Sequence, residues 1–184
     1  SHAFMEVSSH AAHQNRIEGL EFAVAIFSNL THDHLDYHGS FDNYIKAKKS
    51  FFDRLSSEAT AIVNRDDKNG LVMVQNTRAR AMTYSLRNDA DFRAKILENN
   101  FSGLHLLLDG TDFFSGLMGS FNAYNLLAAY ATTQVLGEDK LEVLTALSSI
   151  QAPSGRFEYV RSANQVTGIV DYAHTPDALE KVLG

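Results

Sequence analysis

Imidazole and carboxylate side chains crowd one short stretch of this 184-residue chain. Six of the eight histidines lie within the first 38 residues, and residues 31–38 read Thr-His-Asp-His-Leu-Asp-Tyr-His. Both side-chain types bind divalent metal ions, but the spacing does not match a His-Glu-x-x-His zinc motif. The stretch therefore predicts either a metal-binding loop or a polar loop whose aspartates cap turns, and the residues alone leave both open.

A lysine stands where an apolar residue is expected in a helix predicted over residues 41–55, with Ser40 as its cap. The apolar stripe of this helix consists of Phe41, Tyr44, Phe51 and Leu55. Lys48 lies in the middle of that stripe, where burial is costly unless the amine is paired or neutralised. Its stem can cover the stripe with the ammonium in water, or its amine can act in a site with a lowered pKa or a modification. A neutral amine can also add carbon dioxide to form a carbamate, which is an anionic metal ligand.

Three later positions carry residue types suited to binding a nucleotide. Asn122 and Asn125 lie on the first turn of a predicted helix, where their amides can read an adenine edge, although Asn122 can also be only a cap. Arg156 has a fork of donors that can hold phosphate. Asp171 ends a predicted strand, where its carboxylate can bind ribose hydroxyls or only cap a turn. The sequence contains no Gly-x-x-x-x-Gly-Lys-[Ser/Thr] phosphate loop.

The first half of the chain predicts a parallel sheet that would bring such residues together. Apolar runs at 3–7, 22–27 and 59–63 are typical of buried strands, and the helix at 41–55 separates the last two. Polar clusters follow these runs at 6–10, 29–38 and 64–67. Open parallel sheets bind ligands beyond the carboxyl ends of their strands, so one crevice could collect all three clusters.

The second half predicts a different arrangement. Short strands at 92–97, 103–108 and 112–118, with a hairpin at Asp109-Gly110, indicate a small antiparallel patch at the edge of the sheet. Helices follow over 122–136 and 141–150. A linker around Pro153 then leads to a strand over 168–172 and a helix opened by Pro176. The predicted fold class is α/β: a mostly parallel sheet flanked by helices, an antiparallel edge patch, and one further βα unit.

Composition excludes several classes of protein. Apolar residues make up 45% of the chain and charged residues 21%, which is typical of a globular protein and not of a disordered one. The net charge of −6 offers no basic field for nucleic acid. The absence of cysteine excludes disulfides and Cys-ligated zinc. Because no apolar run approaches the ~20 residues of a membrane span, we expect a cytoplasmic protein without membrane or nucleic-acid partners.

Taken in order, these segments resemble the ATP-dependent Mur ligases of peptidoglycan synthesis. The matching segments are Met5-Glu6-Val7-Ser8-Ser9-His10, Asn29-Leu30-Thr31, 33–39, Ala47-Lys48, Asn64 with Asp66-Asp67, Gly119 with Phe121-Asn122 and Asn125, Gly155-Arg156 with Glu158, and 171–180. They are most similar to the ligases that add the third amino acid, diaminopimelate or lysine, to UDP-N-acetylmuramoyl-L-alanyl-D-glutamate (UDP-MurNAc-dipeptide).

The resemblance also implies a domain organisation. The family has three domains, and residues 1–151 would be the later part of the central ATP-binding domain, with a P-loop-type fold. Residues 152–184 would be a linker and the start of a Rossmann-like C-terminal domain. The family's phosphate loop would then precede Ser1, and we expect the 184 residues by themselves to be inactive.

Roles for individual residues follow from the same resemblance. Glu6 and His34 would bind Mg²⁺ beside the γ-phosphate of ATP, and Lys48 would be carbamylated by carbon dioxide and support that ion. Contacts to the UDP-MurNAc-dipeptide would come from Ser8, Gln14 and Arg16. Contacts to the nucleotide would come from Asn122, Asn125, Arg156, Asp171, Tyr172 and His174. The catalytic roles would fall to Lys48, His34 and Arg156.

The implied reaction is the activation of a carboxylate. ATP phosphorylates the D-glutamyl carboxylate to an acyl phosphate, the incoming amine attacks, and phosphate leaves. The partners would be the UDP-MurNAc-dipeptide, ATP and an amino acid. Two alternatives use fewer of these residues: a metal-dependent phosphoesterase built on the His/Asp loop, and a non-catalytic nucleotide-binding module.

Overall fold

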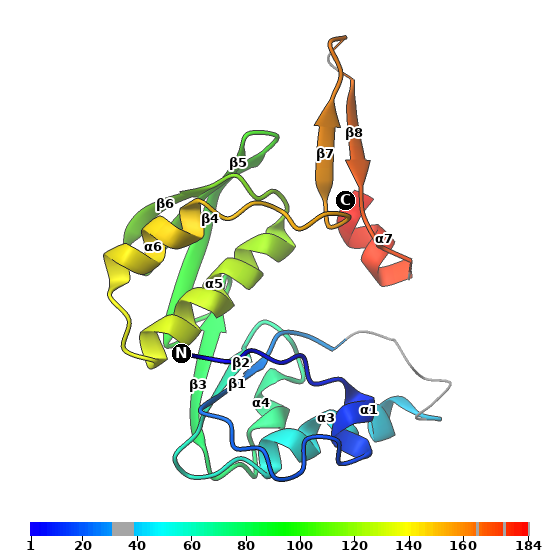
Figure 1. The fold of residues 1–184 in the computed structure, drawn as a ribbon, viewed down its shortest axis with the longest axis vertical. Helices are drawn as coiled ribbons and strands as arrows, with labels where there is room; N and C mark the ends of the chain where they lie inside the picture. The colour runs from blue at the N-terminus through cyan, green and yellow to red at the C-terminus, as the bar shows by residue number, and fades with distance from the viewer. Residues whose placement is uncertain (31–38, 165, 175, 184) are drawn as a thin grey trace. The chain divides into compact units, whose positions relative to one another are not determined.

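The computed structural model describes residues 1–30, 39–164, 166–174 and 176–183, and Figure 1 traces them from blue to red. They form two compact units, Ser1–Phe92 and Arg93–Gly184. Across these described residues, none of the helices has the length and apolar character needed to span a membrane.

A parallel sheet forms the centre of the first unit. Its strands are β1 (Val24–Phe27), β2 (Thr60–Asn64) and β3 (Arg80–Ser85), which pair in that order with Val24 opposite Thr60 and Thr60 opposite Arg80. Every residue of β2 is buried, as its continuous apolar run predicts for a central strand. The parallel pairing predicted for the runs at 22–27 and 59–63 is therefore confirmed.

Among the described residues of this unit, the sheet is accompanied by the helices α1 (Ser9–His13), α3 (Phe41–Asp53) and α4 (Gly70–Met73). The Oγ atoms of Ser8 and Ser40 accept hydrogen bonds from the first turns of α1 and α3, at 3.1 and 3.2 Å, as expected of N-caps. The predicted stripe of α3 is buried at Tyr44 and Phe51 and packs into one core with β1, β2 and α1. The helix that carries Lys48 was thus predicted correctly from its cap and the spacing of its apolar residues.

Two predictions about strands in the first unit need correction. The run at 3–7 is not a strand: Phe4 is 84% exposed, Met5 is 58% exposed, and only Val7 packs against the core. A strand needs a paired neighbour, and the described residues supply none for this run. Conversely, β3 was not predicted, because its first residues are exposed and its apolar content is low, although Tyr84 and Ser85 at its end are fully covered.

An antiparallel sheet and two helices make up most of the second unit. The strands are β4 (Phe92–Asn100), β5 (Gly103–Leu108) and β6 (Thr111–Ser115). Asp109 and Gly110 form the predicted two-residue hairpin turn, both with positive φ (47° and 78°), as a type I′ turn requires. The helices α5 (Ser120–Val135) and α6 (Lys140–Ser148) pack on this sheet, where β5 buries Leu104, Leu106 and Leu108.

A hairpin and a helix end the chain. The strands β7 (Glu158–Arg161) and β8 (Thr167–Val170) pair antiparallel, and α7 (Pro176–Leu183) follows. The predicted strand at 168–172 and the helix opened by Pro176 are both present, whereas β7 was not predicted. The chain as a whole has the predicted α/β class, with parallel strands, flanking helices and a small antiparallel sheet.

Candidate functional site

Four of the residues predicted to bind a nucleotide lie close together: Arg156 in the linker before β7, and Asp171, Tyr172 and His174 after β8. The guanidinium carbon of Arg156 lies 5.3 Å from the centre of the Tyr172 ring, within range of a cation–π contact. The Tyr172 ring meets His174 edge-on at 4.9 Å, and Asp171 precedes both in the chain. Since Tyr172 is 65% exposed and Arg156 is exposed, the cluster offers solvent a cationic group beside an aromatic face.

Asp171 holds the backbone that presents Arg156. Its Oδ2 accepts a hydrogen bond from the amide of Phe157 at 2.7 Å, and its Oδ1 accepts one from the amide of Ala173 at 2.7 Å. Phe157 has a φ of 49°, a left-handed conformation that costs a non-glycine residue about 1–2 kcal/mol. An ionised carboxylate has about four acceptor positions, so Asp171 can bind the linker and still accept from a ligand hydroxyl.

A second carboxylate supports the same turn from inside the linker. Glu158 Oε2 accepts from the amide of Gly155 at 3.0 Å and from Ser154 Oγ at 3.1 Å. Gly155 has a φ of 72°, which only glycine adopts without strain. Residues 154–158 are therefore a compact turn held at both ends, and Arg156 projects from its middle.

The start of α5 adjoins this turn. The ring of Phe121 meets the ring of Phe157 at 5.3 Å, which places the first turn of α5 next to the linker. Asn122 Nδ2 donates to the carbonyl of Met118 at 2.7 Å, and Asn125 Nδ2 donates to Asn122 Oδ1 at 3.3 Å. The N-cap is Gly119 and not Asn122, so the side chain of Asn122 has the separate task of orienting Asn125, which is exposed.

The residues predicted to bind the UDP-MurNAc-dipeptide surround α1 in the first unit. Ser8 caps the helix, while Gln14 and Arg16 are exposed on either side of Asn15, which has a φ of 54°. Because α1 packs against α3, this segment adjoins the helix that carries Lys48. Lys48 is half-buried and its Nζ lies 5.5 Å from the centre of the Tyr44 ring, so its stem does follow the apolar stripe.

The predicted metal ligands are only partly described. Glu6 is exposed in the extended segment before α1, and His34 lies outside the described residues. Among the residues that the structure describes, no three His, Asp or Glu side chains come together. Magnesium usually keeps several waters and takes one or two protein carboxylates beside substrate phosphates, so the carboxylate of Glu6 is a donor of the type that this ion needs.

The polar cluster at 64–67 has a structural task that the sequence did not indicate. Asn64 Nδ2 donates to the carbonyl of Ser28 at 2.9 Å, and Asp67 Oδ2 accepts from the amide of Leu30 at 2.9 Å. These two bonds tie the chain after β1 to the end of β2. Asp66 similarly accepts from Ser85 Oγ at 2.6 Å and joins the ends of β2 and β3.

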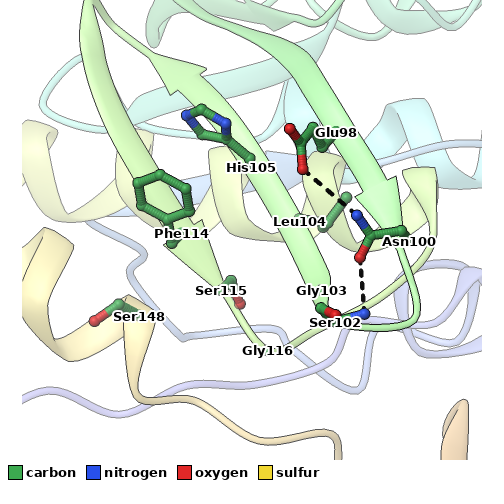
Figure 2. A pocket seen from close by; sticks show the side chains of 10 residues that line it. All are labelled: Glu98, Asn100, Ser102, Gly103, Leu104, His105, Phe114, Ser115, Gly116 and Ser148. Atoms are coloured by element: carbon green, nitrogen blue, oxygen red, sulfur yellow. Dashed lines mark hydrogen bonds between the residues drawn. The ribbon is translucent and has the colours of Figure 1, made fainter.

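A hollow of about 430 Å³ lies elsewhere in the second unit (Figure 2). It is lined by Glu98, Asn100, Ser102, Gly103, Leu104, His105, Phe114, Ser115, Gly116 and Ser148. The imidazole of His105 stacks on Phe114 at 4.1 Å and its Nε2 lies 2.7 Å from Asp112 Oδ1. None of the residues predicted to do chemistry lines this hollow, so it is separate from the candidate site.

Comparisons with known proteins give matches along the whole chain. Residues 1–133 match the family described as the Mur ligase middle domain. The chain is 60% identical over 183 residues to the UDP-N-acetylmuramoyl-L-alanyl-D-glutamate--2,6-diaminopimelate ligase of Cytophaga hutchinsonii, which covers 100% of this chain and 38% of that protein. The protein of the same name from Parabacteroides distasonis is 56% identical over 182 residues, or 99% and 37% of the two chains. The chain thus spans less than two-fifths of the length of these curated relatives.

Solved structures agree with the fold. A structure of a UDP-N-acetylmuramoyl-L-alanyl-D-glutamate--2,6-diaminopimelate ligase superposes with a TM-score of 0.76 at 32% identity, over 96% of this chain and 38% of that one. The MurF ligase of Thermotoga maritima in complex with ADP gives a TM-score of 0.74 at 19% identity, over 95% and 40% of the two chains. At that identity the second likeness concerns the fold alone.

Proposed function

The chain belongs to the Mur ligase family, and on that premise we propose that it is part of an ATP-dependent, ADP-forming ligase acting on UDP-MurNAc-dipeptide. The observation that carries the proposal is the meeting of Arg156, Asp171 and Tyr172 beside the start of α5, in a chain 60% identical to a named ligase. The names of the relatives favour 2,6-diaminopimelate over lysine as the added amino acid.

In this proposal, the second unit binds ATP. Asn125 reads the adenine edge with Asn122 orienting it, and Asp171 accepts from the ribose hydroxyls with the acceptor capacity that its two backbone bonds leave. Arg156 holds phosphate oxygens with its forked donors. Tyr172 and His174 form the aromatic side of the site. The linker turn keeps Arg156 in place while the nucleotide enters, which lowers the entropic cost of orienting it.

The first unit binds the acceptor substrate and supports the charged centre. Ser8, Gln14 and Arg16 contact the UDP-MurNAc-dipeptide, and Lys48, as a carbamate formed by adding carbon dioxide and releasing a proton, presents an anion from α3. Glu6 and His34 would hold Mg²⁺, which offsets the repulsion between the D-glutamyl carboxylate and the γ-phosphate when bound. Arg156, in the second unit, would supply positive charge to the nucleotide phosphates.

Substitution of Lys48 in the full-length protein that contains this chain tests the proposal. Lys48→Ala should lower the rate of ADP release to about a hundredth of wild type or less, in line with the loss of a group acting on transition-state charge. Lys46→Ala is the matched control, because Lys46 lies two residues away on the same helix and is exposed. Product is measured by mass spectrometry with UDP-MurNAc-dipeptide, ATP and diaminopimelate, and folding by circular dichroism.

The same assay separates the alternatives. Wild-type rates from a folded Lys48→Ala protein would refute the role of that residue. Release of phosphate without diaminopimelate or UDP-MurNAc-dipeptide would favour a phosphoesterase. Binding of ATP without any ADP release, with all substrates present, would favour a nucleotide-binding module.

A further inference from the structure

One arginine joins α3, the helix that carries Lys48, to α1, the helix that Ser8, Gln14 and Arg16 flank. Arg54 is the C-cap residue of α3, and its guanidinium donates four hydrogen bonds. Two stay within α3, from Nε to the carbonyl of Ser50 at 3.0 Å and from Nη2 to Ser50 Oγ at 3.1 Å. The other two reach the turn after α1 and α1 itself, from Nη1 to Asn15 Oδ1 at 2.7 Å and from Nη2 to the carbonyl of Ala12 at 2.8 Å.

The α1 side of this contact is a turn that needs external support. The helix α1 has only five residues, too few to be stable by itself in water. Asn15 follows it with a φ of 54°, and the amide of Arg16 bonds back to the carbonyl of Ala11 at 3.0 Å, the pattern of a Schellman C-cap. Arg54 fixes both the carbonyl of the last helical turn and the side chain of the left-handed residue.

The α3 side of the contact is rigid. Ser50 Oγ, which accepts from Arg54, itself donates to the carbonyl of Ala47 at 2.8 Å. The side chain of Arg54 therefore extends from a hydrogen-bonded helix end. The neighbouring Phe51 and Phe52 are buried in the core. This anchor lies less than two helical turns from Lys48 along α3.

We propose that Arg54 is a positioning residue for the acceptor substrate: it holds the turn Gln14-Asn15-Arg16 in a fixed position relative to α3, the helix that carries Lys48. The inference rests on the proposed function, because Gln14 and Arg16 are the predicted contacts to the UDP-MurNAc-dipeptide. Ala12 and Ile17 are buried in the same core cluster as side chains of α3, so α1 is held on the core independently of Arg54. Removal of the guanidinium should therefore loosen the turn without unfolding the unit.

Arginine is needed here because its planar fork reaches two acceptors on α1 and one helix end at once, which a lysine ammonium at the end of a flexible stem does not reproduce. Asparagine suits position 15 for two reasons, since it tolerates a left-handed φ and offers the Oδ1 acceptor. Asn15→Gly separates these reasons by keeping the backbone conformation and removing only the acceptor.

The test uses the full-length protein and four variants: Arg54→Ala, Arg54→Lys, Asn15→Gly and the double variant of Arg54→Ala with Asn15→Gly. Arg78→Ala, at an exposed arginine before β3, is the control. We expect Arg54→Ala and Asn15→Gly each to raise the Kd for UDP-MurNAc-dipeptide, measured by calorimetry, about tenfold, the equivalent of one charge-assisted hydrogen bond. The KM for ATP should stay within about twofold of wild type.

Further expectations distinguish positioning from a purely structural brace. Arg54→Lys should not restore the Kd, and the double variant should be no worse than the weaker-binding single variant, because both changes remove the same bond. Unchanged Kd values in the single variants, or a rise in Kd matched by an equal loss of ATP binding and a collapse of Tm, would overturn the inference. A wild-type protein that binds no UDP-MurNAc-dipeptide would instead overturn the proposed function.

Discussion

At the scale of single residues, the candidate site uses side chains that already have partners in the chain. Asp171 accepts from the amides of Phe157 and Ala173 before any ligand arrives, and Asn122 binds the carbonyl of Met118. Such bonds keep functional groups in one orientation and reduce the cost of ordering them when a ligand binds. A substitution at these positions should therefore affect both the ligand and the local backbone.

Asp171→Asn tests this double role in the full-length protein. The asparagine side chain has one acceptor oxygen, so its NH₂ group would face one of the two backbone N–H groups that Asp171 now binds. About 2 kcal/mol of local stability should therefore be lost, and the backbone N–H of Phe157 should exchange its hydrogen faster. The KM for ATP should rise about tenfold in kinetic assays. Glu180→Gln, at an exposed carboxylate on α7, serves as the control. Faster exchange with an unchanged KM would leave Asp171 as a purely structural residue.

At the scale of elements, patterns confined to neighbouring residues were predictable and long-range pairings were not. The cap and stripe of α3, the continuous apolar run of β2 and the Asp-Gly turn each carry their signal within a few residues. The strand β3 depends on pairing with β2, and β7 depends on β8, so neither has a strong local pattern. The run at 3–7 has the composition of a strand without a paired neighbour among the described residues.

The same distinction applies to the candidate site. Among the predicted site residues, Lys48 is the one that is unusual for its position in an element. Asn125, Arg156 and Asp171 have residue types suited to a nucleotide, but their individual roles come from the resemblance to the Mur ligases and stay predictions. The tie between Asp66 and Ser85, or between Arg54 and Asn15, joins residues 19 and 39 positions apart, and no spacing rule connects them. The missed residues are therefore those that position others, and their only sequence signal was a polar residue near the end of an element.

The turn between β5 and β6 offers a prediction at this same scale. Burial, and then the nearby charge of Asp109, raise the pKa of Tyr130 to about 12 from an ordinary 10, and its hydroxyl donates to Asp109 Oδ2 at 3.2 Å. Because the folded pKa is raised, the stabilising contribution is fully present below pH 10 and is lost as the pH rises through about 12. An ultraviolet titration should show a late-titrating component that decreases by one tyrosine in Tyr130→Phe. Titration of every tyrosine near pH 10 would contradict the assignment.

At the scale of the whole molecule, the charge balance constrains how anionic substrates are bound. The chain carries 16 basic and 22 acidic residues, so a general positive field cannot attract ATP and a UDP-sugar. In the proposed function, attraction therefore comes from local groups: Arg16 in the first unit and Arg156 in the second, both exposed, and a magnesium ion. Binding should consequently weaken only modestly with added salt compared with a protein that relies on a broad basic surface.

The last prediction concerns the 184 residues as a separate protein. The chain spans 38% of the Cytophaga ligase and its sequence contains no Gly-rich phosphate loop, the part that cradles the triphosphate in such folds. Without that cradle, the proposed nucleotide contacts of Arg156 and Asp171 would not be enough to align the γ-phosphate with a carboxylate. We expect the purified 184 residues to release no ADP above background in a coupled assay with both co-substrates, while the full-length protein turns over. Steady turnover by the 184 residues, abolished by Lys48→Ala, would show that this chain contains a complete active site.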